Sequence, residues 1–215
     1  MMKMTQRSFD IAALVDELEP VKPISPRNII VTAAIITMVA LAIIVSITGV
    51  RADLLAGKPE ALFLLRSGIL GLLGFASAYS VLAMASPSVG KHHSSWQMAL
   101  VGAILFPLAG IVALATGDTG LTDAPLSSGL ACLFYSAVTA AATAIPMVVT
   151  LRKGAPTSPE RAGWLTGVAS GGLGTLAYNF HCPYDSLVYT GVWYGCTVAV
   201  CAVAGRLIVP KLIRW

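Results

Sequence analysis

The sequence predicts an all-α fold, an integral membrane bundle of six transmembrane helices preceded by a short amphipathic helix near the N-terminus. Apolar residues make up 56% of the 215 residues and charged residues only 11%, whereas about a quarter of the residues of a soluble domain are charged. The mean hydropathy is +0.80. Apolar runs of about 20 residues, the length that crosses the hydrocarbon core of a bilayer, recur along most of the chain.

The spans follow from these apolar runs and from the polar, Gly- and Pro-containing connections between them. We place them at Ile29–Val50, Ala61–Ala85, Gln97–Thr116, Gly129–Leu151, Ala162–Phe180 and Leu187–Gly205. Every connection is too short for a globular domain. The chain therefore divides into an N-terminal segment, residues 1–28, and a transmembrane domain, residues 29–215.

The basic residues predict the orientation, because short cytoplasmic loops are enriched in Lys and Arg. With a cytoplasmic N-terminus, the outer loops hold only Arg51 and Lys58, and Arg66 lies within the second span; the rest of the 14 basic residues are inside. We therefore expect both termini to be cytoplasmic. The net charge of +4 then reflects topology and not nucleic-acid binding. A cleaved signal peptide is not expected, because the first apolar run begins late and is long enough to span.

Charged residues are almost absent from the spans, which disfavours a transporter or pump. Arg66, near the outer end of its span, is the exception, and we interpret it as an arginine that snorkels to the interface. The fifth and sixth spans carry glycines at four-residue spacing, a pattern that lets helix backbones approach closely. These glycines are Gly163, Gly167, Gly171, Gly191 and Gly195. We expect the last two helices to form a tightly packed hairpin.

The cysteines divide by predicted depth into two within the sixth span, where a thiol acts as a small apolar residue, and two at the outer boundary. The inner two are Cys196 and Cys201. The outer two, Cys132 and Cys182, could form a disulfide. With His181 and Asp185 beside Cys182, the same place could hold a soft metal ion. Two unpaired cysteines, with Asp185 as a helix cap, remain an alternative of equal weight.

The N-terminal segment predicts an amphipathic helix that ends at Pro20. Its apolar stripe consists of Ile11, Leu14, Val15 and Leu18, and Asp16, Glu17 and Glu19 occupy the remaining face. Helices that bind membrane surfaces are typically basic, whereas this helix is acidic. Insertion of the apolar stripe into a groove on a cytoplasmic partner is therefore the better interpretation.

The N-terminal segment contains DIAALVDELEPVKP, and RADL follows the first span. A cysteine opens the fourth span and LRKGAP follows it, HCPYDS precedes a last span that contains Trp193, and the final residues are KLIRW. Together these motifs resemble the NrsF family of membrane anti-sigma factors. The resemblance covers nearly the whole chain. It implies a protein of the bacterial inner membrane that is not an enzyme and needs no cofactor. Its N-terminal segment would hold an extracytoplasmic-function sigma factor inactive, and the protein itself would not contact nucleic acid.

The resemblance also implies a sensor. Cys132 and Cys182 match the paired cysteines of the family and would respond to a transient heavy-metal ion or to an oxidant, with His181 as a further metal ligand. Cys196 and Cys201 have no counterpart in the family pattern. Two other classes stay open, a small membrane transporter and a membrane thiol oxidoreductase. The second would favour a close Cys-x-x-Cys pair, which this chain lacks.

Overall fold

A computed structural model describes residues 26–85, 125–154 and 156–213, together with Ile104, Leu108, Ile111, Val112, Ala115 and Gly117. Within these residues the fold is all-helical, as predicted, with six helices and no strand. The predicted N-terminal helix, which ends at Pro20, lies outside the described residues. Most of the predicted third span, residues 97–116, lies outside them as well.

Five of the helices are long, and one is a single turn. They are α2 (Pro26–Thr48), α3 (Ala52–Leu55), α4 (Ala61–Met84), α7 (Leu126–Gly154), α8 (Pro159–Asn179) and α9 (Leu187–Leu212). Local sequence explains several of their ends. Gly49 follows α2 with a φ of 84°, the left-handed conformation that ends many helices and that glycine adopts without strain. Pro159 opens α8, where its fixed φ suits the first turn.

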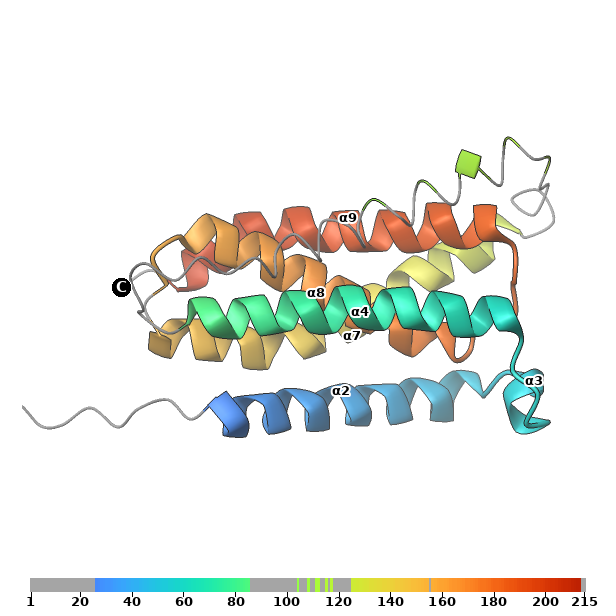
Figure 1. Cartoon of the computed structure of the whole chain (residues 1–215), viewed down its shortest axis with the longest axis horizontal. Coiled ribbons are helices and arrows are strands. Elements are labelled where there is room, and N and C mark those ends of the chain that lie inside the picture. The colour runs from blue at the N-terminus through green and yellow to red at the C-terminus, as the bar shows by residue number, and fades with distance from the viewer. Residues whose placement is uncertain are drawn as a thin grey trace, which may run out of the picture.

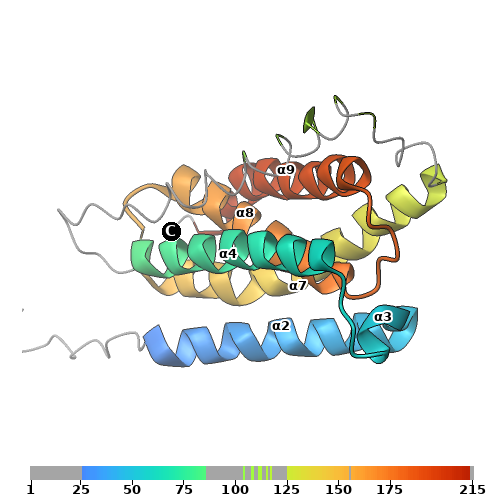
Figure 2. The same cartoon turned by 45° about the vertical axis from the view of Figure 1, so that its right-hand side comes forward.

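Helix α8 lies at the centre of the bundle and packs against α4, α7 and α9. Helix α2 packs against α7 and α8 and lies on the side of the bundle away from α9, as both views show (Figures 1 and 2). The termini of the long helices therefore gather at two opposite ends of an elongated bundle (Figure 1).

The glycines of α8 explain its central position. A Cβ atom on Gly167 would overlap the α9 backbone, one on Gly172 would press on the α4 backbone, and one on Gly174 would overlap the α7 backbone. Three neighbouring helices therefore approach α8 as closely as only glycine permits.

The predicted close packing of the last two helices is confirmed for the glycines of α8 and is wrong for Gly195 of α9. Gly163 and Gly167 do face α9 closely, but their glycine partner there is Gly205. Gly195 has open space where a Cβ would be. The pairing differs because the closest backbone approach, between Gly163, Gly167 and Gly205, lies far from the loop that joins the two helices.

The described residues contain three helices, not six, that are long and apolar enough to cross a membrane: α4, α7 and α9. Of the six predicted spans, the second, fourth and sixth therefore meet this criterion, the first and fifth do not, and the third lies mostly outside the described residues. Helix α8 is rich in Gly, Ser and Thr and buried along most of its length, because it contacts protein on several sides and needs no apolar surface. In α2 the described apolar stretch, Ala34–Thr48, is shorter than a span.

Candidate functional site

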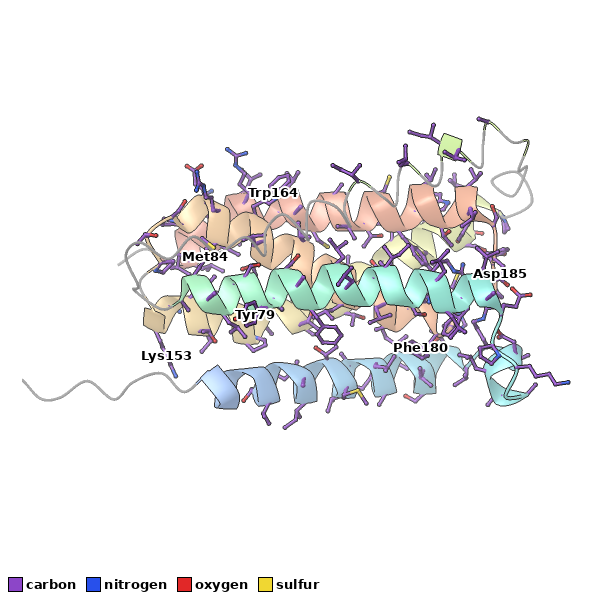
Figure 3. All side chains as sticks on the ribbon, in the orientation of Figure 1. Tyr79, Met84, Lys153, Trp164, Phe180 and Asp185 are labelled. Carbon is purple, nitrogen blue, oxygen red and sulfur yellow. The ribbon has the colours of Figure 1, made fainter. Side chains whose placement is uncertain are left out.

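Two connections meet at one end of the bundle, the one that follows α2 and the one between α8 and α9. The backbone N–H of Arg51 donates to the carbonyl oxygen of Phe180 over 3.2 Å. Nδ1 of His181 lies 3.2 Å from the carbonyl oxygen of Gly49. Asp185 lies at this same end (Figure 3).

The carboxylate of Asp185 accepts hydrogen bonds from two buried arginines. Arg51 donates from Nη1 to Oδ1 and from Nη2 to Oδ2, each over 2.9 Å, and Arg66 donates from Nη2 to Oδ1 over 2.6 Å. The arginine side chains are 5% and 2% exposed, and Asp185 is 29% exposed. Paired bonds from a guanidinium to a carboxylate are among the strongest hydrogen bonds in proteins. Asp185 therefore joins three elements: the end of α2, helix α4 and the α8–α9 loop.

The same arginines also hold the backbone of that loop. Nη1 of Arg51 donates to the carbonyl oxygen of Cys182 over 2.7 Å, and Nη1 of Arg66 donates to that of Tyr184 over 2.6 Å. These bonds satisfy carbonyl groups that no helix uses. The position of the Cys182 backbone is therefore fixed by a side chain from the end of α2.

A second carboxylate balances the charges. Asp53 accepts from Nε of Arg51 over 2.9 Å and from its Nη2 over 3.1 Å, so two arginines face two aspartates. Burial acts to raise the pKa of Asp185, but hydrogen bonds, from Arg51 first, and the charges of Arg51 and Arg66 outweigh it and hold that pKa below its usual value. The hydrogen bond from Arg51 likewise lowers the pKa of Asp53.

A neutral polar chain lies one layer deeper in the bundle. Asn179, fully buried at the end of α8, donates from Nδ2 to Oγ of Ser67 over 2.8 Å. The hydroxyl of Tyr194 donates to Oδ1 of Asn179 over 3.2 Å. We call Arg51, Asp53, Arg66 and Asp185 the charged layer. The bonds of Asn179 link α4, α8 and α9 beneath it, where an unpaired amide would be costly.

Cys132 and Cys182 share one buried cluster at this end. It also contains Leu70, Tyr178, Tyr189 and Tyr194. All four cysteines of the chain are free thiols. The two in the cluster are 0% and 1% exposed, so neither of the thiols predicted at the outer boundary is open to solvent. The side chains of Tyr178, Tyr189 and Tyr194 pack around them, and the hydropathy pattern did not predict this.

His181 does not complete a metal site with these thiols. Its ring packs edge-on against Tyr178, and Nδ1 faces the backbone of Gly49. The described residues contain no group of three or more His, Cys, Asp or Glu side chains placed to hold a metal ion. The structure therefore brings the two predicted thiols together and leaves the predicted imidazole ligand on the α2 side of the loop.

The other predicted site residues lie elsewhere. Cys196 is exposed and Cys201 is half-buried, both along α9. The predicted partner-binding residues lie outside the described residues; they are Ile11, Leu14, Val15, Asp16 and Leu18.

Two sequence interpretations of this end are wrong. Arg66 does not snorkel, because it is buried and bound to Asp185. Asp185 does not cap α9; the Oγ of Ser186 accepts the hydrogen bond from the N–H of Tyr189 instead. One feature of the sequence could have predicted the ion pair: Arg66 is the single charge within the predicted spans, and an arginine at that depth needs a carboxylate partner.

Comparison with known proteins places the chain in a family. Residues 14–215 match the family NrsF, described as negative regulator of sigma F. The chain is 27% identical over 203 residues to the anti-sigma-F factor NrsF of Caulobacter vibrioides (strain NA1000 / CB15N), covering 90% of this chain and 92% of that protein. It is 24% identical over 173 residues to the probable anti-sigma-F factor NrsF of Azospira oryzae (strain ATCC BAA-33 / DSM 13638 / PS), covering 77% and 78%. No solved structure matches the chain. Because the match extends over nearly its whole length, the chain belongs to the NrsF family of negative regulators of sigma F.

Proposed function

We propose that this protein is a membrane-bound anti-sigma factor that sequesters an extracytoplasmic-function sigma factor through its N-terminal segment. The observation that carries the proposal is the extent of the family match. It begins at Leu14, so it includes Leu14, Val15, Asp16 and Leu18 of the predicted amphipathic helix. The curated relatives are named anti-sigma-F factor and probable anti-sigma-F factor.

The N-terminal segment is suited to docking by its pattern. An apolar stripe flanked by carboxylates fits a groove with an apolar floor and basic edges, and a sigma factor that binds DNA phosphates offers basic surface. The segment leads directly into α2, so a sigma factor bound to it would be kept beside the membrane. No contact of this protein with nucleic acid is required.

The proposed location is the bacterial inner membrane, with several spans and with both termini in the cytoplasm. Three helices of sufficient length and apolarity support it, and so do the large apolar side chains exposed along α2, α4, α7 and α9, which lipid tails would cover. The excess of basic residues in one set of loops supports the orientation.

Release of the sigma factor would follow a change at Cys132 and Cys182. Thiolates bind soft metal ions, and thiols are oxidised reversibly. Because both thiols lie in one buried cluster, a metal ion or a disulfide between them would force the aromatic side chains around them to repack. The metal ion would be a transient signal and not a resident cofactor.

Co-purification of the full-length protein with extracytoplasmic-function sigma factors from its own genome tests the proposal. We expect wild-type membranes to retain one such factor, and Leu14→Asp or Leu18→Asp to weaken that binding at least about a hundredfold. A carboxylate buried in an apolar groove without a partner costs roughly 3 kcal/mol or more. Ala13→Asp, which adds the same carboxylate on the opposite face of the helix, is the matched control and should bind normally. Undiminished binding by both the Leu14 and the Leu18 variants would exclude the stripe as the binding element.

A further inference from the structure

Helix α2 is held more firmly at its end than along its length. Of the α2 side chains that the structure describes, only Ile44 is buried. At its C-terminal end, by contrast, polar contacts reach across to the α8–α9 loop: Gly49 with His181, the Arg51 backbone with Phe180, and the Arg51 side chain with Asp185. The position of α2 relative to the bundle therefore depends strongly on that loop.

The loop is also where Cys182 lies. Arg51 contacts the Cys182 carbonyl oxygen with Nη1, the same nitrogen that donates to Oδ1 of Asp185. Asp185 is anchored a second time by Arg66, from α4. A displacement of the Cys182 backbone therefore changes the hydrogen bonds that position the Arg51 guanidinium. Arg66 meanwhile holds the Asp185 carboxylate in place relative to α4.

We propose that Asp185 is a positioning residue: through Arg51 it couples the Cys182 loop to α2, and so to the N-terminal segment that α2 follows. The inference rests on the proposed function for what the N-terminal segment does, but the coupling itself is a property of the membrane domain. In this proposal Arg51, Arg66 and Asp185 transmit a change at the thiols to the N-terminal segment. The thiols and the N-terminal stripe lie on different segments, so a connection between them is needed.

Asp53 provides a matched control. It accepts two hydrogen bonds from the Arg51 guanidinium, as Asp185 does. It lies two residues from Arg51, in α3, and so does not link two distant segments. Asp53→Asn and Asp185→Asn each remove one carboxylate charge from the same arginine. Only the second removes an ion pair between the end of α2 and the α8–α9 loop, which then keeps the contacts of Arg51 with the Cys182 and Phe180 carbonyl oxygens.

The first measurement needs no sigma factor. We expect hydrogen exchange of the full-length protein in lipid nanodiscs to be at least tenfold faster in Asp185→Asn than in wild type over residues 45–55 and 180–186. Asp53→Asn should stay within twofold of wild type. Arg51→Lys is a second variant if Asp185→Asn folds poorly, because lysine keeps the charge but cannot bridge the carboxylate and the Cys182 carbonyl together. Equal exchange in the Asp185 and Asp53 variants would overturn the coupling.

The second measurement separates transmission from a structural role. With a reporter driven by the sigma factor, and Cd²⁺ as the thiophilic probe, Asp185→Asn at normal membrane abundance should still repress, but its induction ratio should fall to under a third of the wild-type ratio. A largely unfolded protein would lose membrane abundance and repression together, which a loss of a few kcal/mol does not cause in a protein of ordinary stability. Full induction in Asp185→Asn would overturn the proposal.

The two proposals fail in distinguishable ways. If wild-type protein represses no sigma factor, the proposed function is wrong, and exchange measured with and without Cd²⁺ still decides the coupling. We expect Cd²⁺ to change exchange over residues 45–55 in wild type and in Asp53→Asn but not in Asp185→Asn. A Cd²⁺ response preserved in Asp185→Asn would overturn it.

Discussion

Arg51 and Asp185, 134 residues apart in the chain, are joined by two hydrogen bonds of 2.9 Å between one guanidinium and one carboxylate. Arg66 completes the group from α4. Charges buried at this depth persist only when they are paired. The arrangement is asymmetric: among the described residues Asp185 is the one carboxylate that pairs with Arg66, whereas Asp185 itself pairs with two arginines. That asymmetry leads to an ordered prediction.

Loss of Asp185 should destabilise the bundle more than loss of Arg66. Asp185→Asn leaves Arg66, which is 2% exposed, without a counter-charge, and we expect a loss of about 3 kcal/mol in the free energy of unfolding. Arg66→Met leaves Asp185 bound to Arg51 and should cost about 1 to 2 kcal/mol, because the methionine fills much of the space. Unfolding in detergent by titration with sodium dodecyl sulfate measures both. The reverse order would show that Arg51 alone does not satisfy Asp185.

Acid should weaken the same end of the bundle within a defined pH window. The folded pKa of Asp185 lies below its usual value despite burial, because hydrogen bonds and the charges of Arg51 and Arg66 outweigh desolvation. A carboxyl group with a lowered folded pKa stabilises the fold fully above its unfolded pKa of about 3.9, and the contribution disappears as pH falls through the folded value. Asp53 acts in the same direction.

Thermal unfolding between pH 7 and pH 3 checks this expectation. The midpoint should change little from these groups down to about pH 4.5 and should fall below that. Glu60 opposes them in part, because the neighbouring Asp185 raises the pKa of Glu60; Glu60→Gln removes that contribution. Asp185→Asn should fall less steeply in acid than wild type. An identical acid slope in that variant would assign the effect to other carboxyl groups.

Two glycines offer a matched test of the helix packing. Gly167→Ala places a methyl group against the backbone of Cys201 and Ala202, whereas Gly195→Ala meets nothing within 4 Å. The first substitution should destabilise the bundle by about 2 kcal/mol, because backbone cannot move aside as a side chain can. The second should change stability by less than about 1 kcal/mol. Detergent unfolding measures both, and equal effects would contradict the assigned contact between α8 and α9.

The two packing features differ in how well the sequence predicts them. Glycine spacing on the fifth predicted span indicated a close approach, because a repeat of four residues marks one helix face without knowledge of the partner. The partner on α9 was not predictable in this way: Gly191 and Gly195 carry the four-residue repeat there, yet the glycine that meets Gly163 and Gly167 is Gly205. Hydropathy also failed for α8, because it measures contact with lipid and not with neighbouring helices.

The charged layer shows a similar division. Arg66 stood out as the one charge within the predicted spans, which predicts a carboxylate partner. Asp185 and Asp53 both lay in predicted outer loops, and a single sequence does not say which loop folds over which helix. The thiols were correctly placed near each other by counting spans, yet their burial depends on Tyr178 and Tyr189, whose orientation no hydropathy pattern contains.

The two buried thiols should prove necessary for the stress response, and the two along α9 should not. Cys132→Ala or Cys182→Ala should abolish induction by Cd²⁺ or by an oxidant such as diamide, because a two-thiolate metal site or a disulfide fails when either member is removed. Each single variant should therefore match the double variant, a non-additive result expected of residues that act as one unit. Cys196→Ala and Cys201→Ala are the controls and should respond normally.

Alanine is a better replacement than serine for this test. Both thiols are fully buried, and a serine hydroxyl in an apolar cluster adds a desolvation cost of about 1 to 3 kcal/mol that would confuse loss of sensing with loss of folding. Membrane abundance of each variant, with repression in unstressed cells, confirms that the fold survives. A normal dose response in the double variant, at normal abundance, would leave the two thiols as packing residues and would move the search for the receptor to another part of the chain.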